Sequence, residues 1–307
     1  MKVRIALIGP GAIGGAAAGA LLARGDHDVT ICANQSFETL TLMRVDTKEA
    51  QSFPVRVFTS PKDAQPADWV LLAVKSHQTP SAADWLKATV GPNAKLAVLQ
   101  NGIEHRERVA PFIPAGTAVV PVVVQLPAER TAPGVITLYG RSNLIVPDDA
   151  VGHEFAELFA GSFMTVTLSD NFATQQWEKL CMNIASGAIS ALTLRTDAIA
   201  NVPGMKELTK KIIEECMTVG RAEGARFAPD LADQLVAFFS RPTYRGNSMY
   251  YDRRDGKQLE YDARNAVICR LGRKHNIPTP LSDALVPLLR AFGPAGQFSP
   301  SSFRHGS

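Results

Sequence analysis

The chain has 307 residues and a formal net charge of +3, from 32 lysines and arginines against 29 aspartates and glutamates. Hydrophobic residues make up 46% and charged residues 20% of it, proportions that exclude a largely disordered chain. The length allows two domains. The charge is spread along the chain, so the concentrated basic surface that nucleic-acid binding requires is not predicted.

The cysteines and histidines predict a reducing compartment and no structural metal. The four cysteines lie far apart without a C-x-x-C pair, and the six histidines lack the spacing of zinc ligands. The apolar run near the N-terminus is too short for a signal sequence, and no uncharged stretch reaches the about 20 apolar residues of a membrane span. We therefore expect a cytoplasmic protein with no membrane partner.

The first half of the sequence alternates short apolar runs with a helical pattern. Runs typical of buried strands cover residues 3–8, 27–33, 69–74 and 95–99, and a small-residue helix covers 13–24. Near-continuous apolar strands separated by helices indicate a mostly parallel sheet with helices on both faces. Three later runs, at 117–125, 134–139 and 143–146, follow one another closely and are expected to be more nearly antiparallel.

The second half changes character near residue 169. Helical periodicity is found at residues 177–194, 206–223, 229–240 and 259–275, and strand-like runs disappear. We therefore predict an α/β domain over residues 1–168 and an all-helical domain over residues 169–292. The tail at 293–307 is rich in Gly, Ser and Pro and is expected to be flexible.

A glycine-rich loop joins the first predicted strand to the first helix. It matches G-x-G-x-x-G with Gly9, Pro10, Gly11, Ala12, Ile13 and Gly14. In this position the first glycine permits a tight turn, the second lets the backbone approach a pyrophosphate, and the third lets the helix pack on the strand. The free N–H groups of the helix favour phosphate. The loop predicts a Rossmann-type dinucleotide site, although a tight turn without a ligand has the same pattern.

The end of the second strand bears on which dinucleotide is bound. NAD sites usually place Asp or Glu there for the ribose 2′-hydroxyl, whereas this sequence has Asn34 followed by Gln35. No carboxylate is present to repel a 2′-phosphate, and no arginine is present to bind it. Because either amide can donate to either head group, the sequence favours NADP only modestly.

Two polar residues follow the next predicted strands. Lys75 ends the run at 69–74, and Asn101 follows the run at 95–99. Ligands of open parallel sheets bind beyond the carboxyl ends of the strands, so both residues are expected in the cofactor crevice. The simpler alternatives are an exposed surface lysine and an ordinary Asn-Gly turn.

In the helical half, Lys179 and Asn183 are four residues apart and share one face of an otherwise apolar helix. Burial of a lysine lowers its pKa toward the working range of a proton donor, although a lysine at a helix edge can also extend to water. Glu260 borders an apolar stripe on the last long helix, where a solvated acid is the common alternative.

A polar stretch at residues 241–256 precedes that helix. Within it Ser248 is a candidate donor to a carboxylate substrate. Arg245, Arg253 and Arg254 are candidates for binding acids, although their acidic neighbours make a solvated charge network the usual interpretation.

Together these residues resemble the ketopantoate reductase family (2-dehydropantoate 2-reductases) over nearly the whole chain. The resemblance rests on the glycine loop, Val74-Lys75, Asn101-Gly102, Trp177-x-Lys179-Leu180-x-x-Asn183, Asn247-Ser248-Met249, Glu260-x-Asp262 and the stretch at 270–280. It implies a Rossmann domain followed by a helical domain, with NADPH and a 2-keto acid meeting between them.

The resemblance also implies roles for single residues. Lys179 falls on the family's proton donor, and Glu260 falls on the acid near the reacting carbonyl and the nicotinamide. Asn34 stands where the 2′-phosphate is read. The remaining cofactor and substrate contacts fall on Lys75, Asn101, Asn183 and Ser248, with Asn101 and Lys179 also contacting the substrate.

Three positions depart from the family pattern. Asn34 stands where the family often has arginine, and Gly187 and Asp197 stand where it has substrate-side asparagines. The sequence therefore predicts NADPH-dependent reduction of ketopantoate to pantoate, on the route to pantothenate and coenzyme A. The alternatives are a paralogue with a different 2-keto acid in a pocket enlarged by Gly187, and a dinucleotide-binding sensor without turnover. A homodimer is compatible with the helical half.

Overall fold

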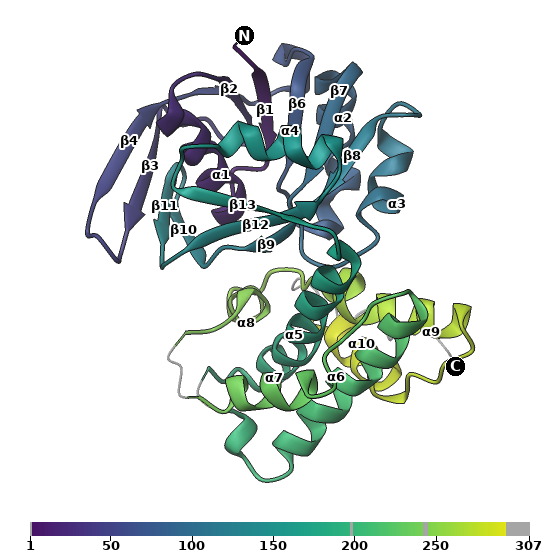
Figure 1. Ribbon diagram of the computed structural model, residues 1–307. Coiled ribbons are helices and arrows are strands. Elements are labelled where there is room, and N and C mark those ends of the chain that lie inside the picture. Colours follow the sequence, from purple (N-terminus) through teal and green to yellow (C-terminus); the bar gives the residue numbers. More distant parts are fainter. Residues whose placement is uncertain (1, 197–198, 242–244, 293–307) are drawn as a thin grey trace, which may run out of the picture. The chain divides into compact units, whose positions relative to one another are not determined.

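The computed structural model describes residues 2–196, 199–241 and 245–292 (Figure 1). The chain divides into two compact units, Met1–Gln175 and Gln176–Ser307. The predicted tail at 293–307 and the predicted family position Asp197 lie outside the described residues. Among the described residues, no helix combines the length and the apolarity that crossing a membrane takes.

The first unit is organised around a six-stranded sheet in the order β5-β2-β1-β6-β7-β8, and all of its neighbouring strands run parallel. This is the strand order of the dinucleotide-binding doubly wound fold, so the predicted Rossmann-type fold is confirmed. The strands are β1 (Arg4–Ile8), β2 (Asp28–Cys32), β5 (Arg56–Phe58), β6 (Ala67–Leu72), β7 (Val90–Val98) and β8 (Ala118–Pro121).

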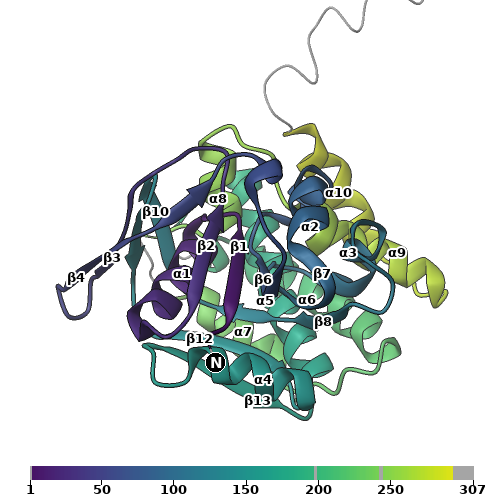
Figure 2. The same cartoon turned by 90° about the horizontal axis from the view of Figure 1, so that it is seen from above.

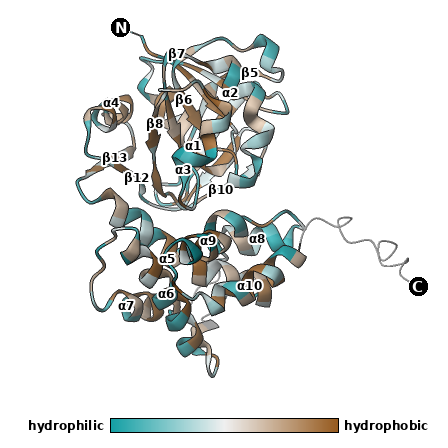
Figure 3. Cartoon of the chain, turned by 90° about the vertical axis from the view of Figure 1, so that its right-hand side faces the viewer, coloured by the Kyte–Doolittle hydropathy of each residue, from teal (hydrophilic) through white to brown (hydrophobic). Residues whose placement is uncertain are grey.

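The strands of this sheet are apolar on both faces because helices cover both. Ile5 and Leu7 of β1 pack with the helix α1 (Ala12–Arg24), whereas Ala6 and Ile8 pack with α2 (Ala83–Thr89) and α3 (His105–Val109). This alternation follows from the two-residue period of a strand. Figure 2 shows α1 on one side of the sheet and α2 and α3 on the other, and Figure 3 shows the apolar colouring along β6 and β7.

Two smaller sheets and a helix complete the first unit. One sheet has the order β10-β11-β3-β4, from β3 (Thr39–Arg44), β4 (Ala50–Pro54), β10 (Ala128–Ala132) and β11 (Val135–Leu138). The other has the order β13-β12-β9, from β9 (Val123–Gln125), β12 (Ser142–Pro147) and β13 (Met164–Ser169), and α4 (Ala150–Phe159) connects its last two strands.

The antiparallel arrangement expected after residue 117 holds only in part. β9 pairs with β12 and β10 pairs with β11 in antiparallel fashion. However, β8 extends the parallel sheet, β11 is parallel to β3, and β12 is parallel to β13. The reason is that helices connect two of these pairs: α3 lies between β7 and β8, and α4 lies between β12 and β13. Strands joined through a helical crossover run parallel. β11 is parallel to β3 because β3 lies far from it in the sequence and reaches its other edge.

The described residues of the second unit form helices joined by loops, and they contain no strand. Its helices are α5 (Phe172–Thr193), α6 (Met205–Ala222), α7 (Leu231–Phe239), α8 (Ser248–Arg254), α9 (Val267–Lys274) and α10 (Pro280–Ala291). Three of them match predicted helices. The predicted helix at 259–275 begins instead at residue 261 and opens with the π-helical turn Asp262–Ala266. α8 lies inside the stretch at 241–256 that was interpreted as polar. It packs against the rest of the unit through the buried Met249 and Asp252.

Candidate active site

The glycine loop that follows β1 requires glycine at two positions. Gly9 has φ +90°, and a Cβ there would lie 2.6 Å from the Val74 side chain. A Cβ on Gly14 would lie 2.2 Å from the carbonyl oxygen of Gly9. A side chain at Gly9 would therefore collide with the segment that follows β6, and one at Gly14 would push α1 away from the turn. The N–H of Gly9 donates to Cys32 O at 3.1 Å, which fixes the turn to the end of β2.

Gly11 is different because the space around it is open. A Cβ on Gly11 would meet no atom within 4 Å, so glycine is not needed there for packing. The first turn of α1 contains no acidic side chain, and its N-cap, Gly11, offers none either. Free N–H groups, a positive helix end and open space suit a diphosphate. Pro10 is buried, and Ala12 and Ile13 are half-buried at the start of α1.

The predicted head-group residue and strand-end residues belong to the same sheet edge. Asn34 is exposed two residues after β2. Lys75 and Asn101 are half-buried beyond the ends of β6 and β7, which are neighbouring strands. Carboxyl ends of parallel strands meet at one edge, so the structure brings all three to the edge that carries the glycine loop.

Gln100 holds the ends of β6 and β7 together, a role that sequence reasoning missed. Its buried side-chain amide donates to Val74 O at 2.9 Å and to Thr79 Oγ1 at 3.0 Å. The backbone N–H of Lys75 donates to Gln78 Oε1 at 3.2 Å. These bonds set the backbone on either side of Lys75 and directly before Asn101.

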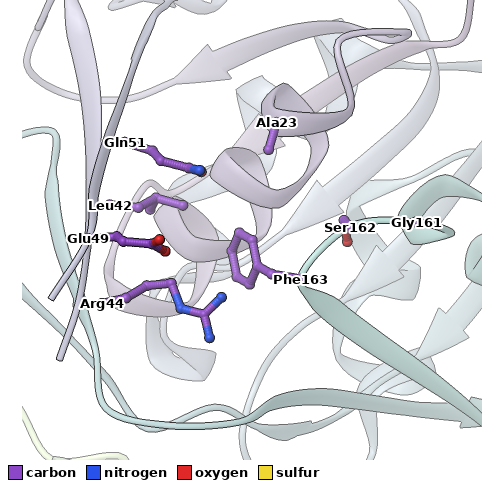
Figure 4. A pocket seen from close by; sticks show the side chains of 8 residues that line it. All are labelled: Ala23, Leu42, Arg44, Glu49, Gln51, Gly161, Ser162 and Phe163. Carbon is purple, nitrogen blue, oxygen red and sulfur yellow. The ribbon is translucent and has the colours of Figure 1, made fainter. Parts of the chain in front are cut away.

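A separate pocket lies at the far end of α1. Its lining comes from the last turn of α1, from β3 and β4 and from the segment after α4, where Arg44 lies 5.8 Å from the Phe163 ring (Figure 4). Ala23 lines it, and the glycine loop is at the opposite end of the same 13-residue helix. This pocket is therefore not the predicted phosphate site.

The second unit places Lys179, Asn183 and Gly187 on successive turns of one side of α5. Lys179 and Asn183 are half-buried, and their neighbours Leu180 and Ile184 are fully buried. Thus α5 holds a lysine beside a core that offers its ammonium little water.

Burial lowers the pKa of the Lys179 ammonium, and the positive charge of Arg264 lowers it further. Both effects disfavour the protonated form. Within the described part of the chain, no hydrogen bond or ion pair reaches the Lys179 side chain. An ammonium with a lowered pKa and no salt-bridge partner is a stronger acid than a surface lysine.

Glu260 is not a solvated acid. It is 3% exposed and lies directly before the helix that begins at residue 261, rather than on it. Its Oε2 accepts a 2.9 Å bond from Nη2 of Arg264, whose side chain is 2% exposed. The structure therefore pairs Glu260 with Arg264. The positive charge of Arg264 also acts on Lys179, whose pKa it lowers.

Ser248 belongs to the same group. The same Nη2 atom of Arg264 donates to Ser248 Oγ at 2.9 Å, and Ser248 is exposed at the first residue of α8. Asn247 caps α8 by accepting from the N–H groups of Met249 and Tyr250, while its Nδ2 donates to Ser186 O and to Ser190 Oγ. One asparagine thus ties the Ser248 end of α8 to α5.

The space beside Gly187, which one alternative from the sequence assigned to a larger substrate pocket, is taken up by other side chains. A Cβ at Gly187 would lie 2.8 Å from Met249 Sδ and 3.5 Å from Arg264 Nη1. Met249 is fully buried. The space that a larger residue would fill is therefore occupied by a methionine and bordered by a guanidinium.

The arginine of the site is a residue that sequence reasoning missed. The candidates were Arg245, Arg253 and Arg254, but the Arg253 guanidinium lies 4.0 Å from the Phe292 ring and Arg254 pairs with Asp255. Arg264 was overlooked, although the spacing of four residues from Glu260 is a signal for an ion pair on one helical face. Among the described residues, no group of three or more His, Cys, Asp or Glu could hold a metal ion.

Comparisons with known proteins agree over both units. Residues 5–150 match the family described as "Ketopantoate reductase PanE/ApbA", and residues 171–293 match "Ketopantoate reductase PanE/ApbA C terminal". The 2-dehydropantoate 2-reductase of Caulobacter vibrioides is 43% identical over 94% of this chain and 98% of its own length. The 2-dehydropantoate 2-reductase of Mycobacterium tuberculosis is 39% identical over 95% of this chain and 98% of its own length.

The fold agrees as well. The structure of dimeric ketopantoate reductase from Staphylococcus aureus matches 94% of this chain and 98% of its own, with a TM-score of 0.84 and 28% identity. A Rossmann-type unit, a helical unit with a half-buried lysine, and relatives over almost the full length lead to one assignment. The chain belongs to the ketopantoate reductase family.

Proposed function

We propose that this protein reduces 2-dehydropantoate (ketopantoate) to pantoate with NADPH. The observation that carries the proposal is Lys179, a half-buried lysine without a salt-bridge partner among the described residues, in a chain that matches 2-dehydropantoate 2-reductases along 94% of its length. A pure binding protein has no need for an ammonium on the apolar face of α5.

Lys179 would supply the proton of the reaction. When bound, the dihydronicotinamide supplies a hydride to the keto carbon, and negative charge then develops on the carbonyl oxygen. The Lys179 ammonium stabilises this charge and transfers one proton to the oxygen, which completes the hydroxyl group. Its lowered pKa favours the transfer, and water restores the proton to the amine.

The residues of the first unit fit a nicotinamide dinucleotide. The open space at Gly11 and the start of α1 would take the diphosphate. We further propose NADP rather than NAD, because the end of β2 carries the uncharged Asn34 and so no carboxylate that would repel a 2′-phosphate. Lys75 would add a positive charge to this edge of the sheet.

We expect the enzyme to work as a homodimer in the cytoplasm. The related Staphylococcus aureus enzyme is described as dimeric. The four cysteines are free and buried, as is usual in a reducing compartment.

The Lys179→Ala variant tests the proposed function. We expect kcat for ketopantoate to fall about 10²- to 10⁴-fold, while NADPH binding, measured by fluorescence titration, stays within about twofold of wild type. Lys206→Ala, which changes an exposed lysine of α6, is the control and should keep full activity. Near-normal turnover by Lys179→Ala would refute the mechanism.

The substrate is tested on the wild-type enzyme. Steady-state rates over a panel of 2-keto acids should rank ketopantoate first in kcat/KM. A higher value for another acid would identify a paralogue with the same chemistry, and no turnover with any acid would favour a sensor.

A further inference from the structure

Arg264 connects two side chains that belong to different segments of the second unit. Its Nη2 atom donates to Glu260 Oε2 and to Ser248 Oγ, both at 2.9 Å. Glu260 precedes the helix that contains Arg264, and Ser248 begins α8. The side chains of Arg264 and Glu260 are 2% and 3% exposed, so the bond between them forms where water is nearly excluded, whereas the bond to Ser248 lies at the edge of this buried pair.

The bond to Arg264 determines what the Ser248 hydroxyl is able to do. Its oxygen already accepts from a charged donor, so its own proton is available for donation elsewhere. Ser248 is exposed, which leaves that proton accessible to a ligand. Glu260, in contrast, accepts a hydrogen bond from the guanidinium through Oε2.

The neighbours of Arg264 leave room for the guanidinium. A Cβ on Gly187 would come within 3.5 Å of Arg264 Nη1 and within 2.8 Å of Met249 Sδ, so a longer side chain at position 187 would compete with both residues. Arg264 Nε is buried and has no hydrogen-bond partner among the described residues. Nη2 therefore carries both bonds by which Arg264 holds Glu260 and Ser248.

We propose that Arg264 is a positioning residue for the keto acid site: it fixes the Ser248 hydroxyl as a donor to the substrate and holds the Glu260 carboxylate in place beside it. The proposal rests on the proposed function. Gly187 belongs to the same arrangement, because its missing side chain leaves the space that Met249 and the guanidinium use.

Lysine cannot take over this role, although it keeps the charge. A guanidinium is a planar fork with fixed donor directions, whereas an ammonium is a compact point charge on a flexible stem. Arg264→Lys therefore keeps a cation near Glu260 but is expected to lose the fixed bond to Ser248. This makes Arg264→Lys the informative variant, since it keeps a positive charge beside the buried Glu260.

A double-mutant cycle tests the link. We would measure kcat/KM for ketopantoate at saturating NADPH for wild type, Ser248→Ala, Arg264→Lys and the double variant. Each single change should lower kcat/KM about 10- to 100-fold. The double variant should lie within about threefold of the worse single variant, because both changes remove the same oriented donor. A loss in the double variant equal to the product of the single losses would overturn the proposal.

Controls separate positioning from folding. Arg273 lies in α9, which continues the helical turn that contains Arg264, and it forms an ion pair with Asp283 of α10. Arg273→Lys should therefore leave the kinetics unchanged. Thermal unfolding of each variant shows whether it folds. Should Arg264→Lys not fold, the cycle is repeated with Glu260→Gln/Arg264→Met, which removes both charges of the buried pair. The quantity measured in this second cycle is the dissociation constant of pantoate from the enzyme–NADP⁺ complex.

In that second cycle, adding Ser248→Ala should change the dissociation constant by less than about threefold, and a change of tenfold or more would overturn the proposal. Wild-type enzyme that turns over no 2-keto acid would refute the proposed function instead. Independent effects of Ser248 and Arg264 in an active reductase would refute only the positioning role.

Discussion

The contact between Gly14 and the turn at Gly9 gives the sharpest prediction for the first unit. In Gly14→Ala, the new methyl group would lie 2.2 Å from Gly9 O and 2.9 Å from the Cβ of Ala73. Gly9 O belongs to the turn that bonds β1 to β2, so neither contact is with a flexible side chain. The start of α1 would have to retreat by about 1 Å to restore ordinary van der Waals distances.

The size of the effect follows from this displacement. Overpacking at a tight position costs about 1–3 kcal/mol, and the gain in helix propensity from Gly to Ala returns at most about 1 kcal/mol. A net loss of about 1–2 kcal/mol should lower the unfolding temperature by about 2–8 °C for a unit of this size. A shift of the N–H groups at the start of α1 should also weaken NADPH binding at least about tenfold.

Gly11→Ala is the matched control variant, because its Cβ would meet no atom within 4 Å and its φ of −72° suits alanine. Its stability should fall by less than about 1 kcal/mol, while its methyl group obstructs the approach of the diphosphate. Thermal unfolding and NADPH titration of both variants are the assay. Wild-type stability and affinity in Gly14→Ala would refute the close contact, and normal NADPH affinity in Gly11→Ala would refute the diphosphate site.

Two further predictions concern charge. Asn34→Asp should weaken NADPH by about tenfold and NADH far less, because a carboxylate would repel the 2′-phosphate; equal changes in the two titrations would contradict the proposed NADP site. His105 is 3% exposed, and burial lowers its pKa to about 4. In the unfolded chain His105 binds a proton near pH 6.5, whereas in the folded chain it does so only near pH 4. The free energy of unfolding should therefore fall by about 2 kcal/mol between pH 7 and pH 5. Urea unfolding at both pH values, compared with His105→Gln, isolates this contribution; the same pH dependence in the variant would show that other groups cause it.

The strands β1, β2, β6 and β7 of the main sheet were predictable because their apolar residues are buried on both faces, whereas the short β5 was missed and β8 was expected to be more nearly antiparallel. The apolar runs at β1 and β6, together with the glycines before α1, were enough to predict strand, turn and helix. β4 was missed because most of it is exposed, and its burial shows no alternation. β3 was overlooked although it carries the signal of a half-buried strand, since the buried Leu40 and Leu42 alternate with more exposed residues.

The site was predictable where a single helix carries the signal. The spacing of Lys179 and Asn183 on an apolar helix indicated both residues, and burial does lower the pKa of Lys179. Arg264 was missed because its role depends on Ser248, which tertiary packing brings to it. A spacing in one sequence shows which residues share a helical face, but it does not show which loop packs against that face.

The small-residue surface of α1 has a consequence for how the chain is made. The side chains of Ile136 in β11 and Leu42 in β3 pack against Gly15 and Gly19 of this helix, and β3 pairs in parallel with β11. During synthesis on the ribosome, Thr41 of β3 therefore cannot pair with Val135 of β11 until Val135 has emerged from the exit tunnel. Until then the nascent chain exposes the glycine face of α1 and the unpaired edge of β3, a state in which strand edges are prone to aggregate. Chaperone binding during synthesis should accordingly concentrate before residue 138 leaves the exit tunnel.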